Sequence, residues 1–446
     1  MVADGRVWRP RRPSQTPLHA AVRAGWPEVR ADLAERTGVP RRVRVEVARY
    51  LGCGDVRRGF VQVRCGSCRR TELVAFSCKQ RGLCPSCGAR RSHETAAYCG
   101  EVLPEVPWRQ WTLSMPYRLR WVLVKRPELL RLVERRLVRA VWRWQRRRAR
   151  GLGMSGELHG GAVGFTQYFG SALQLTPHHH VLFPEGLWDE ASGFVALPPP
   201  SAEDVEAVLR RVLRQLAKDL EEVESPWPED DFEGLVAQAA QQRLQWVDEP
   251  DTRRRPRRLA VLEGFSLHAD TWVHERDRQG LERLCRYGSR GPVALERLSV
   301  REDGRYAYRT RKGQVLVFTA EQLVKRLIAL LPPAKVHLTR FHGVFAPNAR
   351  LRSRVMRRPQ ELVPEPTSAV EQRARKRERP RLDWASLQRR TFEADVWACP
   401  CGGRRRVLAV VTSRRTAEEV LGNLGLLPRP LPLPASQSPP QQQLAL

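Results

Sequence analysis

The chain has 446 residues, enough to bury a sizeable core in two or three domains. Its 78 lysines and arginines against 48 aspartates and glutamates give a net charge of +30. A surplus this large favours a polyanionic partner, usually nucleic acid. No apolar run approaches the roughly 18 residues of a transmembrane helix, and the start lacks the pattern of a signal peptide. We therefore expect a cytoplasmic protein without a membrane partner.

The chain opens with a basic, proline-containing arm over residues 1–16. A helical stretch over 18–51 is expected to lead into a block that holds six of the ten cysteines, within 53–87. Because no export signal is present, this density indicates metal binding rather than disulfides.

Two Cys-x2-Cys pairs with fifteen residues between them dominate the cysteine block. The four cysteines are Cys65, Cys68, Cys84 and Cys87. Each pair can form a tight turn that presents two sulfurs, so the spacing predicts one structural zinc site with four thiolates. Cys53 and Cys78 are left over, either for a second zinc site or as buried thiols. Further on, Cys399 and Cys401 supply only two ligands, so a partial metal site and unpaired thiols are both open.

A strand is expected over 109–114, and Pro127 then opens a long helix, since proline is tolerated in the first turn. The apolar residues that recur there at helical spacing are Leu130, Val133, Leu137, Val141 and Trp144. Arginines occupy the other faces of this helix with few acids beside them. The pattern fits a phosphate-facing helix or an ordinary solvated surface.

Three consecutive histidines lie in the second strand of a hairpin expected over 160–183. Alternate residues of a strand share a face, so His178 and His180 point the same way and are spaced for one metal ion. His179 points to the opposite face. The alternative to a metal site is a surface cluster or a set of histidines held by core hydrogen bonds.

The remaining elements are a helix over 201–222, a strand over 259–268, a helix over 276–287, a hairpin over 305–318 and a helix over 321–331. Ser201 and Asp204 have the spacing of a capping box at the start of the first of these helices. A basic linker over 351–390 and a disordered tail over 428–446 flank a small segment over 391–427.

Tyr287 lies off the apolar stripe of the helix over 276–287, on the side of Arg283 and near Arg286. Most such tyrosines only cap a helix end. A free tyrosine has a pKa of about 10 and is a weak nucleophile, but cationic neighbours and a metal-polarised phosphate would make attack feasible.

Six segments carry a resemblance to a known family. They are FSCKQRGLCPSC at 76–87, PWRQWTL at 107–113, FGSALQLTPHHH at 169–180, GFSLHA at 264–269, LCRYGSR at 284–290 and LTRFHGVFAPN at 338–348. In this order the chain resembles the rolling-circle transposases of the insertion sequence 91 family, in their single-tyrosine, common-region-like form. That family belongs to the HUH (His-hydrophobic-His) superfamily of single-strand DNA nucleases.

The resemblance implies an α+β fold, in which an HUH nuclease domain with a central antiparallel sheet flanked by helices follows a zinc-binding domain. The expected division is a basic arm at 1–16, a zinc-binding and DNA-binding domain at 17–108, a catalytic domain at 109–350, a linker at 351–390, a C-terminal segment at 391–427 and a tail at 428–446.

The resemblance also implies that His178 and His180 hold a catalytic Mg²⁺ or Mn²⁺ and that Tyr287 is the nucleophile. Sites of this kind need a third polar ligand, for which Gln167 is favoured over His268, while Glu185 lies too far along the strand. The residues expected to contact DNA are Arg283, Arg286, Arg290, Arg340 and His342.

The sequence departs from the family at three places. His179 stands where a bulky apolar residue is usual, and Arg283 stands where two-tyrosine members have their first tyrosine. The Cys399-Pro400-Cys401 motif shortens the family's later Cys-x2-Cys motif.

The implied function is transposition, in which single-stranded DNA is cut and rejoined through a 5′-phosphotyrosine intermediate. Structural zinc and catalytic Mg²⁺ or Mn²⁺ are the expected cofactors. The expected partners are single-stranded DNA at the element ends, target DNA and a second copy of the chain. The alternatives are a plasmid replication initiator or relaxase with the same chemistry, and a zinc-dependent DNA-binding protein with an inactive nuclease centre.

Overall fold

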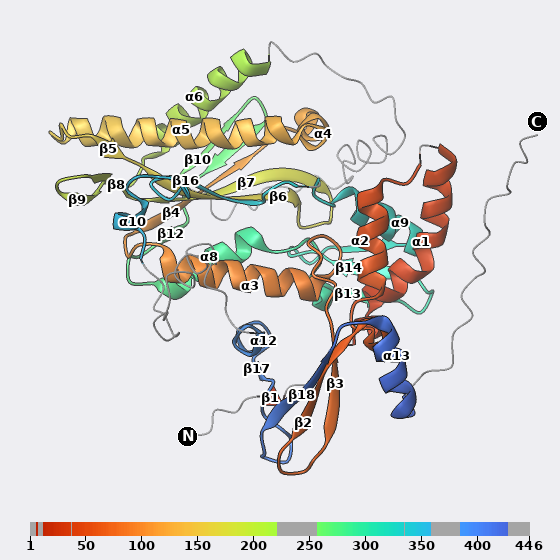
Figure 1. Ribbon diagram of the computed structural model, residues 1–446. Coiled ribbons are helices and arrows are strands. Elements are labelled where there is room, and N and C mark those ends of the chain that lie inside the picture. Colours follow the sequence, from red (N-terminus) through yellow and green to blue (C-terminus); the bar gives the residue numbers. More distant parts are fainter. Residues whose placement is uncertain are drawn as a thin grey trace, which may run out of the picture.

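The computed structural model describes residues 6–7, 12–36, 38–220, 257–333, 335–357 and 384–426. A seven-stranded sheet forms its centre, and all neighbouring strands are antiparallel (Figure 1). The spatial order is β10 (Leu259–Leu262), β11 (Phe265–His268), β4 (Trp108–Ser114), β7 (Leu175–Pro184), β6 (Gly161–Phe169) and β16 (Thr339–Gly343), with β12 (Trp272–Val273) also paired to β4. Strand β6 is buried along its whole length.

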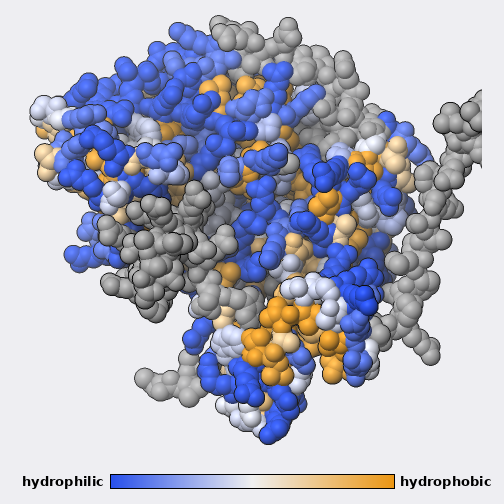
Figure 2. All heavy atoms as spheres, in the orientation of Figure 1, coloured by the Kyte–Doolittle hydropathy of each residue, from blue (hydrophilic) through white to orange (hydrophobic). Residues whose placement is uncertain are grey.

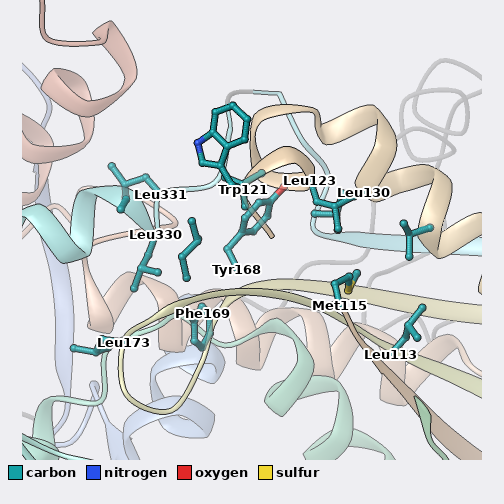
Figure 3. Packing of buried hydrophobic residues seen from close by; sticks show 14 of the residues in the cluster. Leu113, Met115, Trp121, Leu123, Leu130, Tyr168, Phe169, Leu173, Leu330 and Leu331 are labelled. Atoms are coloured by element: carbon teal, nitrogen blue, oxygen red, sulfur yellow. The ribbon is translucent and has the colours of Figure 1, made fainter. Parts of the chain in front are cut away.

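Helices cover both faces of this sheet (Figure 1). One face carries α4 (Tyr117–Lys125), α5 (Pro127–Gly151) and α6 (Ala202–Leu220), and the other carries α3 (Pro85–Val102) and α8 (Arg278–Ser289). The predicted apolar stripe of the helix that Pro127 opens is buried, as expected. Figure 3 shows how Leu113 of β4 and Tyr168 of β6 face Trp121 of α4 and Leu130 of α5. The predicted α+β class with antiparallel sheets is therefore confirmed.

The amino-terminal helices share the core of the central region. Helix α1 (Pro17–Arg36) packs against α9 (Ala320–Ala329), and α2 (Arg41–Leu51) follows it after a break that ends at Pro40. The packing of α1 is close, since a Cβ on Gly25 would lie 2.5 Å from the backbone of Ala320. A three-stranded sheet of β13 (Leu298–Val300), β14 (Tyr306–Arg309) and β15 (Val315–Phe318) precedes α9.

A second three-stranded sheet joins the two ends of the chain. Strand β2 (Phe60–Cys65) lies between β3 (Thr71–Ala75) and β18 (Arg405–Val411), and α13 (Arg414–Asn423) covers it. Beside it, β17 (Ala394–Asp395) follows α12 (Trp384–Phe392) and pairs with β1 (Arg6–Val7). Figure 2 shows hydrophobic residues gathered over this sheet, where Val407 and Val410 of β18 are exposed.

The smaller elements are a sheet of β5 (Leu158–His159), β8 (Gly186–Asp189) and β9 (Gly193–Ala196), the helix α10 (Arg352–Val355), and the 3-10 turns η1 (Pro13–Gln15), η2 (Val56–Arg58) and η3 (Leu295–Arg297).

Most of the predicted elements are present with boundaries shifted by a few residues. The capping box at α6 is formed, because the Ser201 N–H donates to Asp204 and the Asp204 N–H donates to the Ser201 hydroxyl. The predicted helix over 18–51 is instead two helices. Most of the predicted arm and linker and all of the predicted tail lie outside the described residues. Within the described ranges no helix is long and apolar enough to span a bilayer.

Candidate functional site

The two alternate histidines lie in the centre of the sheet, on the face that α8 covers. His178 pairs with Ser114 of β4 on one side and Gln167 of β6 on the other, and His180 is the cross-strand partner of Thr112. The rings of His178 and His180 stand 4.8 Å apart, centroid to centroid. The period of two in an extended strand thus produces the predicted pair.

Hydrogen bonds fix the orientation of both rings. His178 Nδ1 donates to the Thr176 carbonyl at 2.8 Å, and His180 Nδ1 lies 3.1 Å from the Thr112 hydroxyl. The Nε2 atom of His180 is buried and has no hydrogen-bond partner among the described residues. A ligand histidine is commonly held in this way, through one nitrogen, while the other faces the metal.

Burial keeps these histidines neutral. It is the largest cause that lowers the pKa of His178 to about 4, and it also lowers the pKa of His180 well below its ordinary value. A neutral imidazole has the lone pair that a metal requires. Both side chains are therefore ready to bind a cation at neutral pH without losing a proton.

Gln167 connects the pair to the tyrosine helix. Its Nε2 donates to the carbonyls of Tyr287 at 2.6 Å and Gly288 at 3.0 Å, which leaves its buried Oε1 without a hydrogen-bond partner among the described residues. Two imidazole nitrogens and an amide oxygen are ligands that Mn²⁺ accepts, and Mg²⁺ favours such oxygens. The residues present thus fit a divalent cation, with two buried polar atoms left for it.

The two other candidates for the third metal ligand, His268 and Glu185, are less favourable than Gln167. His268 lies on β11, two strands from β7 and thus about 10 Å across the sheet. Its ring faces Asp270, with 3.5 Å between the nearest nitrogen and oxygen atoms. Glu185 accepts a hydrogen bond from Arg109 and so has a structural partner.

Tyr287 stands over the histidines. Its ring centroid is 5.3 Å from that of His180. The guanidinium of Arg290 lies 4.8 Å and that of Arg311 5.0 Å from the centre of the phenol ring, and Arg311 donates to the hydroxyl at 3.5 Å. The phenol is therefore held between two cations next to the histidine pair.

The local sequence of α8 explains how the tyrosine reaches this place. Asp277 caps the start of the helix by accepting from the Gly280 N–H at 2.7 Å. Near its end, Gly288 lets α8 approach β6, because a Cβ there would lie 2.7 Å from the ring of Phe165. A larger residue at 288 would push the tyrosine away from the sheet.

The cysteines form two groups rather than the predicted one. The first group is Cys53, Cys78, Cys84 and Cys87, and the second is Cys65, Cys68, Cys399 and Cys401. Within each group the four ligand atoms lie within 4.8 Å of one another.

The predicted site that combined both Cys-x2-Cys pairs is therefore wrong. Cys65 and Cys68 lie at the far tip of the β2–β3 hairpin, whereas Cys84 caps the start of α3 near the hairpin's base. A six-residue strand separates tip from base by about 20 Å. Cys53 and Cys78, which the sequence left open, complete the group at the base.

The base group connects to the tyrosine through α3, which runs along α8. Cys99 of α3 and Cys285 of α8 are both fully buried in one hydrophobic cluster. Arg278 at the start of α8 donates to the carbonyls of Leu103 and Pro104, just beyond the end of α3. The helix that begins at two cysteine ligands therefore supports the helix that carries Tyr287.

Comparisons with known proteins agree with this arrangement. A family model described as a putative transposase matches residues 161–353, and a model described as a transposase zinc-binding domain matches residues 22–115. The transposase for insertion sequence element IS801 from Pseudomonas savastanoi pv. phaseolicola is 24% identical over 414 residues, which is 87% of this chain and 88% of that protein. The chain belongs to the insertion sequence 91 family of transposases. No solved structure matches it.

The zinc-binding family supports structural zinc in this transposase, and the base group of cysteines provides a complete set of ligands. Four thiolates leave no open position on the ion, so such a site stabilises the fold rather than taking part in catalysis.

The arginines predicted to contact DNA lie at different distances from the tyrosine. Arg290 stacks on Tyr287 and also on Phe169, at 5.0 Å. Arg283 is exposed one turn before Tyr287 and pairs with Asp277 at 3.4 Å. Arg286 is exposed toward α3; after burial, its charge is the next cause that lowers the pKa of His93 to about 4.

Arg340 and His342 do not lie at the site, contrary to the prediction. They pair with Gly164 and Ala162 of β6, on the α5 face of the sheet, and their side chains approach buried Glu134 of α5 at 3.7 and 3.2 Å. Burial raises the pKa of Glu134, but the His342 hydrogen bond and nearby cations outweigh it and lower the pKa overall. Arg340 therefore pairs with a buried carboxylate to which His342 is hydrogen-bonded, and both residues lie on the face of the sheet opposite Tyr287.

His179 belongs to the same opposite face, as its position in the strand predicts. It is fully buried, with Nδ1 3.1 Å from the Thr166 hydroxyl and Nε2 3.0 Å from the Leu130 carbonyl of α5. These two bonds anchor the centre of β7, so His179 positions the two histidines beside it.

Arginine-lined hollows lie on the surface of the transposase. One of about 710 Å³ lies between α2, the loop before α3 and the end of α9, and a smaller one of about 220 Å³ continues from it to Gln167 and Gly288. Both are lined by Arg81 and Arg91. On the α5 face of the sheet, a hollow of about 500 Å³ is lined by Arg136, Arg139, Arg143, Arg146, Arg147, Arg150 and Arg211.

Sequence reasoning missed Arg311, Thr112 and Glu134. Arg311 lies in the turn of a hairpin that the sequence does predict, but no pattern shows that this turn approaches Tyr287. Thr112 could have been found only from the pairing register of β4 and β7. Glu134 was one acid among many arginines, and only its burial shows its importance.

Proposed function

We propose that this transposase cuts and rejoins single-stranded DNA by rolling-circle transposition, with Tyr287 as nucleophile. The observation that supports it most is the phenol ring of Tyr287 held 5.3 Å from the ring of His180 and between the guanidiniums of Arg290 and Arg311. A nucleophile, cations for a phosphate and unused metal ligands meet at one point, as phosphoryl transfer requires.

In this proposal the Tyr287 oxygen attacks the phosphorus of the scissile phosphodiester. The bond to the 3′ oxygen breaks, which leaves a 5′-phosphotyrosine and a free 3′-hydroxyl. Attack by a different 3′-hydroxyl on that phosphotyrosine reverses the chemistry and joins the strand to a target. The covalent link conserves the phosphodiester bond energy, so the reaction needs no ATP.

His178, His180 and Gln167 would hold Mg²⁺ or Mn²⁺. A bound cation supplies Lewis-acid polarisation of the phosphate. Two arginines would stabilise the charges of the reaction. Arg311 stabilises negative charge on the phenol oxygen, and Arg290 lies where a phosphate next to the ring would bind. Gln167 also fixes the end of α8 through its two carbonyl contacts.

A DNA strand would reach the site along the basic hollow beside α2. The exposed cations there, Arg41, Arg49 and Lys79, lie in the amino-terminal zinc-binding domain, and the adjoining hollow ends at the carbonyl end of α8. On this path the zinc-binding domain would recognise DNA next to the point of cleavage. A DNA partner also implies a cytoplasmic location.

The test is the formation of a covalent protein–DNA adduct. Purified protein is incubated with Mn²⁺ and a single-stranded oligonucleotide that carries an end of the element with its flank, and adducts are resolved on a denaturing gel. We expect an adduct with the wild type and with Tyr117→Phe, a control tyrosine on α4, and none with Tyr287→Phe. An adduct with Tyr287→Phe would exclude this nucleophile.

Two further outcomes separate the parts of the proposal. Cleavage that survives simultaneous replacement of His178 and His180 by alanine would refute their metal role. If wild type and Tyr287→Phe bind the oligonucleotide equally and neither forms an adduct, the protein is a zinc-dependent DNA-binding protein with an inactive centre.

The arginine-lined hollow on α5 lies across the sheet from Tyr287 and would bind a second stretch of DNA. Replacing Arg139, Arg143 and Arg147 by alanine should weaken binding and reduce the slope of log affinity against log salt by about 2 for single strands. With DNA at saturation the adduct yield should be unchanged. An unchanged slope would show that this face does not bind DNA.

A further inference from the structure

We propose that Cys65, Cys68, Cys399 and Cys401 bind a second structural zinc ion, which fastens the C-terminal segment to the amino-terminal zinc-binding domain. The family model for the zinc-binding domain ends at residue 115 and so covers only two of these four cysteines. The other two come from the segment just before β18 (Figure 1).

The distances between the sulfur atoms fit a tetrahedral zinc ion. Cys65 Sγ lies 3.6 Å from Cys401 Sγ, and Cys68 Sγ lies 3.7 Å from Cys399 Sγ. Four sulfurs at about 2.3 Å from zinc stand about 3.8 Å apart along each edge of the tetrahedron. A disulfide would bring two sulfurs to about 2.05 Å. The pairs are therefore spaced for a shared ion rather than for a covalent bond.

Each pair of cysteines lies in a preformed turn. In the first, the Cys65 N–H donates to the Arg70 carbonyl at 3.0 Å. In the second, the Cys399 N–H donates to the Gly403 carbonyl and the Gly402 N–H to the Cys399 carbonyl, both at 2.9 Å. Such turns present two sulfurs on one side, as in known zinc knuckles.

The two turns are also fitted to each other. The Gly66 N–H donates to the Arg404 carbonyl at 2.9 Å, which joins the hairpin tip to the C-terminal segment. A Cβ on Gly403 would lie 2.4 Å from the Ser67 hydroxyl and 2.9 Å from Cys65 Sγ. Glycine at 403 thus allows an approach that would bring the four sulfurs together around one ion.

The three-stranded sheet of β3, β2 and β18 and the elements packed on it bury few apolar side chains. Its main hydrophobic cluster has four buried residues, Phe60, Val411, Ala417 and Leu421, and a neighbouring cluster adds Ala394 and Val396. Units with so small a core usually depend on a metal or a disulfide. A zinc ion at the tip, opposite the cluster at the base, would hold both ends of β2 and β18 together.

Zinc content of the full-length protein tests the proposal. Metal analysis of the purified wild type should give two zinc ions per chain, one for each cysteine group. Cys399→Ser with Cys401→Ser should give one, whereas Pro400→Ala, which lies between the two cysteines and keeps both thiols, should retain two. One zinc in the wild type, or two in the double cysteine variant, would overturn the proposal without any assay of activity.

A second measurement covers the case in which the double variant does not fold. Cobalt substituted into the wild type should show thiolate charge-transfer absorption at an intensity for eight sulfurs per chain, and absorption for four would contradict a second site. Hydrogen exchange then measures whether the zinc site holds the C-terminal segment in place. Amides of β18 should lose protection in the double variant while those of β7 keep theirs, and equal protection of β18 in both proteins would show that no metal holds it.

Discussion

Replacing Gly288 by alanine should slow adduct formation strongly while leaving zinc content and DNA affinity unchanged. The new Cβ would lie 2.7 Å from Cγ and 2.9 Å from Cβ of Phe165, which is 1% exposed and has no space to move aside. Carbon atoms in contact stand about 3.5–4.0 Å apart, so α8 must shift by about 1 Å. A displacement of that size at a reacting group lowers the rate by about 10²-fold.

The assay is single-turnover adduct formation with DNA in excess of its dissociation constant. Gly291→Ala is the matched control, because a Cβ at Gly291 meets nothing within 4 Å. Its adduct rate should equal that of the wild type. A wild-type rate for Gly288→Ala would refute the idea that the approach of α8 to β6 sets the position of Tyr287, whereas loss of DNA binding would show general damage instead.

Three other predictions follow from the contacts of the site. Arg311→Ala should lower the single-turnover adduct rate by about 10²-fold, as loss of one oriented donor to a charged oxygen does, while Arg309→Ala on the same hairpin should not; equal rates would exclude Arg311. Since burial holds the pKa of His178 at about 4, below the ordinary value of about 6.5, Mn²⁺ binding followed by electron paramagnetic resonance should be equal at about pH 6 and about pH 7.5. A loss of Mn²⁺ affinity already at pH 6 would contradict the low pKa. Because the pKa of His178 is lower in the folded than in the unfolded chain, the unfolded chain binds a proton first as the pH falls. His178 therefore lowers the free energy of unfolding as the pH falls from about 6.5 to about 4. Glu134→Ala should lower the free energy of unfolding by about 1–3 kcal/mol in urea titrations, because it removes the buried carboxylate that partners Arg340 and His342. Exposed Glu128→Ala should leave the free energy of unfolding unchanged, and similar midpoints for both variants would disprove the role of the Glu134 contacts.

The sequence was sufficient wherever local periodicity decides the outcome. The period of two in a strand places His178 and His180 on one face and His179 on the other, and the helical period places the apolar stripe of α5 against the sheet. The same parity separates Arg340 and His342 from the site, but it could be applied to them only once the pairing of β16 with β6 was known.

Long-range contacts could not be predicted from spacing. Two Cys-x2-Cys pairs at zinc-site spacing indicate one site, yet the β2–β3 hairpin holds the first pair at its tip, away from the second pair. Cys399 and Cys401 join the first pair there. Arg311 reaches Tyr287 only because a hairpin after α8 folds back over it. Gln167 was favoured as a ligand from its place on the neighbouring strand, but its contacts with the end of α8 required the structure.

The pairing of β2 with β18 also determines when this sheet can form during synthesis. Cys65 and Cys401 are 336 residues apart, so a ribosome working at about 5–20 residues per second needs roughly 20 to 70 s to deliver the second after the first. Until then β2 pairs only with β3, and its other edge is open. A transposase chain that stops before residue 399 would carry the tyrosine and both histidines with this edge unpaired, and would be a ready substrate for proteases.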